Sequence, residues 1–427
     1  MKNLFLLLIL QGVLLSATLG EIEVKGVKVP FIFEKDSTLP IGSLELVFQN
    51  SGSIEDYNQS GVAAFTASIL NEGTKKLGSV GFAKKLEENA IHIGVHRGNE
   101  SFSMELSSLM EKFDEGAEYF KELLSDPNFS KESFEKIKLL KIASIKKRES
   151  DFDYIASVGL KKLRYKGTAI ENPAIGTIES LEALTLKDIE AFFQKHMVLS
   201  RAVVIVGGDL TQEEGKKLAQ KVLSTLEVGK SEPLVRFGSL EKSERVEIIK
   251  DTEQAYVYFG APYYMEVDDK DAYKSKVASF ILGSGGFGSR LMEEVRVKRG
   301  LAYSAYARTS LNRSHSHFSG HLQTKLESQE EAIKIVKEVI SEFVKKGATE
   351  DELEQAKKFI IGSEPLRNET LSQRLNRTFK EYYKGLEIGH SKKELEMIGK
   401  LTLKELNDFI SSHDEINKLS FSIVTKK

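Results

Sequence analysis

A repeated segment constrains this chain more than any other feature of its sequence. LTLKDIEAFFQKH, at Leu184–His196, aligns without a gap with LTLKELNDFISSH, at Leu401–His413. A second pair, KKLRYKG at Lys161–Gly167 and FKEYYKG at Phe379–Gly385, recurs at a similar offset. Self-similarity at a fixed distance indicates a duplicated structural unit. We therefore expect two domains of one design, each about 200 residues long.

Each half combines strands with amphipathic helices, and a short polar segment separates the halves. Residues 227–243 carry Pro and Gly among charged residues and predict a linker. It would separate an N-terminal domain, residues 21–226, from a C-terminal domain, residues 244–427. Strands that follow one another directly in sequence favour antiparallel pairing. The predicted fold class is α+β, with two homologous domains that each have an antiparallel sheet and helices packed on one face.

Hydrophobic periodicity in the first half predicts both strands and helices. Ile22–Phe33 alternates between apolar and polar residues and predicts one strand. Gly61–Leu70 has the spacing of a helix, and so does the much longer stretch Lys131–Tyr165.

The first twenty residues predict a secretory signal peptide that is cleaved before Glu21. One Lys precedes a short apolar run, and the small residues Thr18 and Gly20 stand just before the predicted cleavage site. Gln11 interrupts the run, which argues against a membrane anchor, and no later stretch is apolar enough to span a bilayer. We therefore expect a soluble, exported chain, which in a Gram-negative cell is periplasmic.

The composition excludes several kinds of chemistry. The chain contains no Cys, so disulfides, thiolate zinc sites and cysteine nucleophiles are excluded. Charged residues make up 29% of the sequence, and the formal net charge is −2. Nothing in this balance predicts binding to nucleic acid or to an anionic membrane surface.

The stretch GGFGSRLMEEVRVKRGLAYSAYA, at Gly285–Ala307, runs from a glycine turn through a helix into a strand that follows Gly300. Arg296 and Tyr303 lie on either side of this helix-to-strand turn, which can bring their side chains to one cleft wall. Both groups can donate hydrogen bonds to a peptide carbonyl or an oxyanion. The residues alone leave open the alternative that Arg296 is a surface cation and Tyr303 a core aromatic residue.

The tandem halves, the linker, the exported chain and the RVKRGLAY turn together resemble the insulinase/pitrilysin family of zinc peptidases. The second half of that family carries the motif R-x-x-x-x-x-x-Y, which here corresponds to Arg296 and Tyr303. The resemblance covers essentially the whole mature chain. It implies a clam-like half-chamber in which Arg296 and Tyr303 are catalytic, substrate-binding residues.

The zinc motif of the family is degenerate in this chain. In the family, H-x-x-E-H places two His ligands on one face of a helix, with a Glu that activates water. The stretch GVAAFTASILNEGT, at Gly61–Thr74, keeps the surrounding frame, but Ala64 and Ser68 replace the two His and Ala67 replaces the Glu. The family's third ligand is a later Glu, and Lys136–Arg148 in that region contains no carboxylate. We therefore expect no metal and no cofactor in this chain.

The resemblance implies a division of labour between two chains. A zinc-bearing homologous partner would supply the attacking hydroxide, while Arg296 and Tyr303 hold the peptide backbone or the tetrahedral oxyanion. This predicts a pseudopeptidase that is inactive alone and hydrolyses peptides as part of a heterodimer. Two alternatives stay open: a non-catalytic peptide-binding protein, in which case a homodimer is possible, and a purely structural scaffolding subunit.

Other motifs point less clearly to a function. GSGGFG, at Gly283–Gly288, formally matches G-x-G-x-x-G but lacks a βαβ context, which argues against nucleotide binding. DYNQS, at Asp56–Ser60, fits a glycosylation sequon of some bacterial periplasms, with Asn58 as the acceptor.

Two sets of His share strand parity: His92 with His96, and His315, His317 with His321. No carboxylate interleaves with either set in the sequence, which argues against metal binding, and we expect His315 to lie in a turn.

Overall fold

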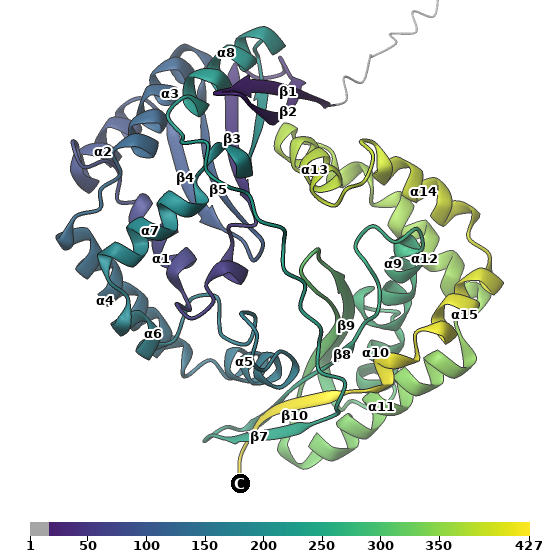
Figure 1. The fold of residues 1–427 in the computed structure, drawn as a ribbon. Helices are drawn as coiled ribbons and strands as arrows, with labels where there is room; N and C mark the ends of the chain where they lie inside the picture. The colour runs from purple at the N-terminus through teal and green to yellow at the C-terminus, as the bar shows by residue number, and fades with distance from the viewer. Residues whose placement is uncertain (1–16) are drawn as a thin grey trace, which may run out of the picture.

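Two β-sheets, one in each half of the chain, organise the structure (Figure 1). The computed structural model describes residues 17–427. The strands of the first half are β1 (Thr18–Val24), β2 (Val27–Lys35), β3 (Ile41–Gln49), β4 (His92–Arg97), β5 (Ser101–Leu109) and β6 (Ala202–Gly208). Its helices are α1 (Val62–Leu70), α2 (Gly78–Glu88), α3 (Met110–Ser125), α4 (Lys131–Arg148), α5 (Phe152–Arg164), α6 (Ile178–Ala183), α7 (Leu186–His196) and α8 (Gln212–Leu223).

The second half repeats this plan. Its strands are β7 (Arg245–Ile249), β8 (Gln254–Pro262), β9 (Ala302–Leu311), β10 (Ser316–Lys325) and β11 (Ser420–Thr425). Its helices are α9 (Ala272–Ser279), α10 (Arg290–Met292), α11 (Gln329–Lys346), α12 (Glu350–Gly362), α13 (Leu371–Tyr383), α14 (His390–Lys400) and α15 (Leu403–Ser412).

The two sheets share one strand order. The first sheet runs β1-β2-β6-β3-β5-β4 and the second runs β7-β11-β8-β10-β9, so five positions correspond one to one once the edge strand β1 is set aside. In each sheet one corresponding pair, β2–β6 or β7–β11, is parallel, and the other pairs are antiparallel. The predicted α+β fold with two similar halves is confirmed, with one parallel pair added to each sheet.

The repeated LTLK letters encode the start of the corresponding helices α7 and α15. Thr185 and Thr402 are the N-cap residues, and each side chain accepts a hydrogen bond from the third residue of its helix. The side chains of Asp188 and Glu405 bond back to the cap, which completes a capping box in both halves. The most visible sequence repeat therefore marks the start of the helix that precedes the last strand of each half.

One helix from each half crosses to the sheet of the other half. α5 packs against β8 and β11, and α13 packs against β2 and β6 (Figure 1). Glycines leave room at both crossings: a Cβ on Gly159 of α5 would lie 2.2 Å from Ser422 Oγ, and one on Gly207 of β6 would lie 2.7 Å from Leu375 Cδ1, so the neighbouring side chains would have to shift. The second repeated pair of sequences contains the ends of these two helices. The two halves are thus interlocked.

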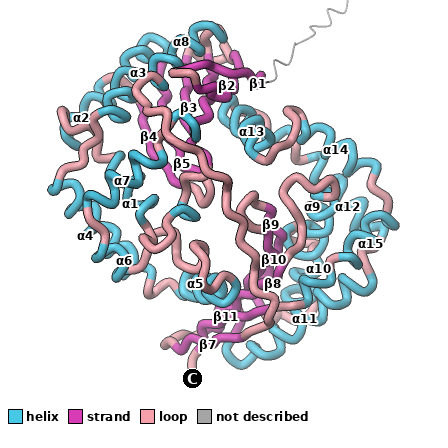
Figure 2. Tube along the Cα trace, in the orientation of Figure 1, coloured by secondary structure: helices cyan, strands magenta, loops and turns pink. Residues whose placement is uncertain are grey.

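The predicted linker, residues 227–243, contains no helix or strand and runs between the two halves (Figure 2). Its backbone is nevertheless held on both sides. Arg201 Nε donates a hydrogen bond to Lys230 O at 3.1 Å, and Phe237 N donates one to Ser314 O at 2.7 Å. The segment therefore packs against the first and the second half.

Two predicted elements of the first half were too long. Ile22–Phe33 is not one strand but the hairpin β1–β2, because Lys25 and Gly26 form its turn with φ values of 51° and 76°. Lys131–Tyr165 is not one helix but two, because the Asp151 side chain accepts a hydrogen bond from Tyr154 N and starts α5.

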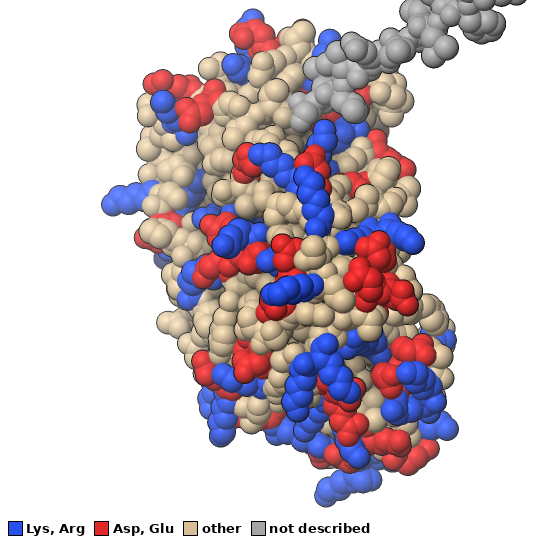
Figure 3. Space-filling view, turned by 90° about the vertical axis from the view of Figure 1, so that its right-hand side faces the viewer, with Lys and Arg blue, Asp and Glu red and all other residues tan. Residues whose placement is uncertain are grey.

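The predicted signal peptide lies mostly outside the described residues, which begin at residue 17. Its last three residues, Thr18–Gly20, belong to β1 and pair with Phe31–Phe33 of β2. Export and cleavage before Glu21 therefore stay predictions. Between residues 17 and 427, no helix combines the length and the apolar character needed to cross a membrane. On the face shown in Figure 3, basic and acidic side chains are interspersed, in line with the small net charge.

Candidate functional site

Arg296 and Tyr303 meet across a tight turn. Arg296 lies in a π-helical segment, Glu293–Val297, and Tyr303 is the second residue of β9. Gly300 N donates a hydrogen bond to Arg296 O at 2.9 Å and has a φ of 61°, a conformation that favours glycine. The turn places Arg296 Cζ 4.4 Å from the centroid of the Tyr303 ring.

A second aromatic ring, Phe287, also contacts the Arg296 guanidinium. Its centroid lies 4.6 Å from Arg296 Cζ. Phe287 stands between Gly286 and Gly288, whose positive φ values bend the loop that presents the ring. Cation–π contacts use the faces of a guanidinium and leave its in-plane N–H groups for a ligand. Among the described residues, no Asp or Glu forms an ion pair with Arg296.

A β-bulge turns Tyr303 away from the core. Ala302 pairs with Thr324 and Ala305 with Leu322, so Tyr303 and Ser304 together stand opposite one residue of β10. Ala302 and Ala305 are buried, whereas Tyr303 is 81% exposed. The alternative that Tyr303 is a core aromatic residue is therefore wrong.

The degenerate zinc motif lies on α1, and its residues cannot take the place of the lost ligands. Ala64 and Ala67 are buried, and the Ser68 hydroxyl donates a hydrogen bond to Ala64 O at 3.1 Å within the same helix. Two methyl groups and a hydroxyl bonded to its own helix offer neither a zinc ligand set nor a base for water.

Charged side chains collect near the start of α1. The Asp56 carboxylate accepts hydrogen bonds from Gly61 N and Ala63 N, and burial raises the pKa of Asp56 to about 7. Burial, with a smaller effect of Arg97, lowers the pKa of Lys141 on α4 to about 8. The family's catalytic region is thus occupied here by apolar side chains, the buried carboxyl of Asp56 and cations.

The two His sets differ in their surroundings. His92 and His96 on β4 both contact Glu105 Oε1, at 3.2 and 3.1 Å. No carboxylate stands between them in the sequence, but Glu105 reaches both rings because it lies on the neighbouring strand β5. The carboxylate oxygen itself fills the space between the two imidazoles.

In the second set, His315 lies in the β9–β10 turn, as expected, and its ring stacks on that of His317 at 5.3 Å. His321 stacks on Tyr258 instead, at 5.2 Å. Over residues 17–427, no group of three or more His, Cys, Asp or Glu side chains is placed to hold a metal ion. Asn58 is exposed in the loop before α1, and its glycosylation stays a prediction.

Phe287 is the residue of the candidate site that sequence reasoning missed. It lies inside GSGGFG, a stretch that predicts a glycine turn and formally matches a nucleotide motif but by itself assigns no role to the ring. The available signal was an aromatic residue between two glycines, a position where a ring is easily exposed. The run begins inside a π-helical segment, Phe280–Ser284, and ends before α10.

Comparison with known proteins assigns the fold to a family. The profile described as Insulinase (Peptidase family M16) matches residues 31–178, and that of the Peptidase M16 inactive domain matches residues 183–360. The non-peptidase homolog YmxG of Helicobacter pylori is 44% identical over 426 residues, which cover 99% of this chain and 98% of that protein. The chain belongs to peptidase family M16. The resemblance to insulinase-type peptidases is thereby confirmed.

Solved structures share the whole fold. The peptidase M16 inactive domain from Pseudomonas fluorescens matches with a TM-score of 0.88 at 24% identity, over 96% of this chain and 98% of that one. A protease from Helicobacter pylori matches with a TM-score of 0.83 at 17% identity, over 96% of this chain and all of that one. These structures show the fold, whereas the lost ligands on α1 and the similarity to the 44% identical non-peptidase homolog indicate a zinc-free, non-peptidase M16 homologue.

Proposed function

We propose that this chain is the zinc-free subunit of an exported M16 metalloprotease and that it binds the substrate backbone for a zinc-bearing homologous partner. The observation that carries the proposal is the Arg296 guanidinium, which lies over two exposed rings and has no ion pair among the described residues. An arginine held in this way is ready to bind an incoming acceptor.

Arg296 and Tyr303 supply donors to one substrate group. The in-plane N–H groups of Arg296 and the O–H of Tyr303 donate hydrogen bonds to a peptide carbonyl, and these bonds strengthen as the oxygen becomes an oxyanion. An interaction that is stronger in the transition state raises the rate of hydrolysis rather than only the affinity. The partner supplies the attacking hydroxide, since α1 of this chain offers no ligand set for zinc.

The main alternative is a protein that captures or scaffolds peptides without taking part in cleavage, alone or as a homodimer. The same exposed donors would serve that role. The two functions differ in whether hydrolysis by a second M16 chain depends on this one.

Reconstitution separates these possibilities. The mature chain is purified alone, and a zinc-bearing M16 chain from the same cell is purified alone and mixed with it. We expect no stoichiometric zinc in this chain by elemental analysis, a complex of the two chains by gel filtration, and turnover of a quenched peptide at least tenfold above that of either chain. A zinc-bearing chain that is fully active alone, or that does not associate with this chain, would contradict the proposal and favour the peptide-binding alternative.

A further inference from the structure

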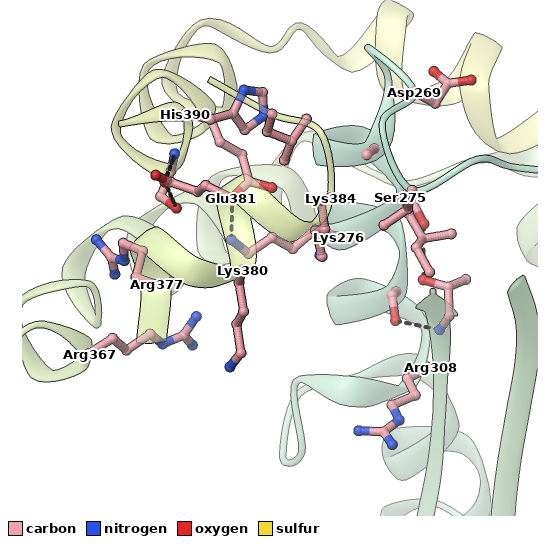
Figure 4. Close-up of a pocket in the computed structure, with 18 of the residues that line it drawn as sticks. Asp269, Ser275, Lys276, Arg308, Arg367, Arg377, Lys380, Glu381, Lys384 and His390 are labelled. Atoms are coloured by element: carbon pink, nitrogen blue, oxygen red, sulfur yellow. Dashed lines mark hydrogen bonds and ion pairs between the residues drawn. The ribbon is translucent and has the colours of Figure 1, made fainter. Parts of the chain in front are cut away.

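A polar pocket lies at the other end of β9 from Tyr303. Its volume is about 690 Å³, and it opens between β9 and α9 on one side and α13 and α14 on the other (Figure 4). β9 contributes Tyr306 and Arg308, and α13 contributes Arg377 and Lys380. The pocket lies outside both the Arg296–Tyr303 pair and the degenerate motif on α1.

The charged side chains that line this pocket are mostly cationic. Six Lys or Arg residues face three Asp or Glu residues. Two of the carboxylates are already engaged: Glu394 pairs with Lys276 at 2.7 Å, and Glu381 accepts hydrogen bonds from Gly389 N and Ser391 N at 2.7 and 2.8 Å. The third, Asp269, lies apart from the cations in Figure 4.

Four of the lining cations have no carboxylate partner among residues 17–427. Within the part of the chain that the structure describes, no carboxylate forms an ion pair with Arg308, Arg367, Lys380 or Lys384. Figure 4 shows Arg367 and Lys380 on the wall formed around α13, with Arg308 on the opposite wall. Cations gathered in a concave site raise the local concentration of anions. A pocket of this width, with charges on separate elements, suits several carboxylates better than one compact anion.

The bulge in β9 connects this pocket to the Arg296–Tyr303 pair. Because Tyr303 and Ser304 both stand opposite Gln323, Tyr303 lies on the same face of the sheet as Tyr306 and Arg308, the face away from the core of the second half. Tyr303 and Arg308 are five residues apart, which corresponds to roughly 16 Å along a strand. An extended peptide covers that distance with about five residues.

We propose that this cationic pocket binds acidic side chains of an extended peptide whose backbone is held at Arg296 and Tyr303. The acidic residues lie about four to six positions from the held peptide bond. The inference rests on the proposed function and deepens it, because it names acidic peptides as the preferred class.

Fluorescence anisotropy on the purified full chain tests the pocket without any partner. One labelled peptide carries a Glu-Asp-Glu block, and its matched control carries Gln-Asn-Gln at the same place. We expect the acidic peptide to bind about tenfold more tightly at low salt, with the preference shrinking as salt rises. The double variant Arg308→Gln/Lys380→Gln should remove the preference, whereas Lys404→Gln, an exposed cation paired with Asp408 on α15, should keep it.

The outcomes separate the two proposals. An acidic preference that survives Arg308→Gln/Lys380→Gln overturns the pocket proposal and leaves the role of Arg296 untouched. A preference that is lost in this variant, combined with unchanged hydrolysis by Arg296→Ala in the reconstituted complex, supports the pocket and overturns the proposed function. Inorganic pyrophosphate is the competing probe: tight pyrophosphate binding without any acidic-peptide preference would show a phosphate site and overturn the proposal.

Discussion

Phe287 positions the Arg296 guanidinium without forming a hydrogen bond to it. We expect Phe287→Ala to lower the turnover of the reconstituted complex about three- to tenfold, because a cation–π contact is worth roughly 1 kcal/mol at an exposed site. Since Phe287 is 73% exposed, the melting temperature should not change. Turnover of a quenched peptide and differential scanning fluorimetry measure the two effects.

The matched control for this change is Val80→Ala. Val80 on α2 is also largely exposed, at 81%, and lies in the first half of the chain. Equal turnover of both variants and the wild-type chain would show that the Phe287 ring does not assist Arg296.

Glu45 on β3 gives the fold a pH dependence. Burial, followed by the nearby charge of Glu105, raises the pKa of Glu45 from 4.5 to about 7. Between these two values the folded chain retains a proton that the unfolded chain has released, so stability falls as the pH rises from about 4.5 to 7. Glu45→Gln replaces this carboxyl by an amide that does not ionise. The melting temperature of the variant should therefore fall less between pH 5 and pH 8 than that of the wild-type chain. An identical fall in both proteins would show that Glu45 is ionised without cost in the folded state.

At the scale of elements, α13 anchors the second half to the first through Arg374. Its guanidinium bonds to the buried carboxylate of Glu34, and to Asp36 Oδ2 at 2.6 Å. Removing one partner of a largely buried pair leaves the other charge unpaired. We expect Arg374→Ala to reduce the free energy of unfolding by about 2–3 kcal/mol, measured by urea denaturation.

Two further variants check that interpretation. Glu34→Gln in the Arg374→Ala background should recover part of the loss, because no unpaired charge then stays buried. Lys404→Ala breaks the exposed pair with Asp408 and should cost less than about 0.5 kcal/mol. Equal losses from Arg374→Ala and Lys404→Ala would contradict an anchoring role for Arg374.

Local sequence patterns predicted most of the helices and strands, and the two repeats predicted two similar halves. They did not predict the contacts between different elements. The capping boxes of Thr185 and Thr402 are local, so the LTLK repeat reveals them directly. The bulge at Tyr303 changes the parity of β9 through its pairing with β10, which alternation within β9 alone cannot show. Glu105 lies between His92 and His96 only because β4 and β5 are neighbours. The crossing of α5 and α13 depends on contacts between segments far apart in the sequence, such as Gly159 and Ser422, which no periodicity contains.

Within the candidate site the same distinction holds. The spacing of Arg296 and Tyr303 around Gly300 was enough to predict that their side chains meet. In the structure, Arg296 Cζ lies 4.4 Å from the centroid of the Tyr303 ring. Phe287 was missed because the bends at Gly286 and Gly288 place its ring against Arg296, and no helical or strand periodicity relates the two residues. The cationic pocket was missed because Arg308 and Lys380 lie on different elements.

At the scale of the whole molecule, two interlocked halves present polar surfaces to a shared space. A cavity of about 790 Å³ is bordered by Gln49 of the first half, Pro233 of the linker and Arg313 of the second half. The chain retains the M16 architecture but not its zinc ligands; Tyr303 is exposed, and the half-buried Arg296 forms no ion pair among the described residues. This combination is what a division of labour between two M16 chains requires.

The most direct measurement is the turnover of a quenched peptide by the reconstituted complex that carries Tyr303→Phe or Arg296→Ala. Loss of one oxyanion donor typically lowers the rate by about 10²- to 10³-fold, and Tyr303→Phe keeps the ring over Arg296. We predict that each variant stays folded, still associates with the zinc-bearing partner by gel filtration, and loses at least tenfold in turnover. Unchanged turnover by both variants in an intact complex would contradict a catalytic role for this pair, and the chain would then be a peptide-binding or scaffolding subunit.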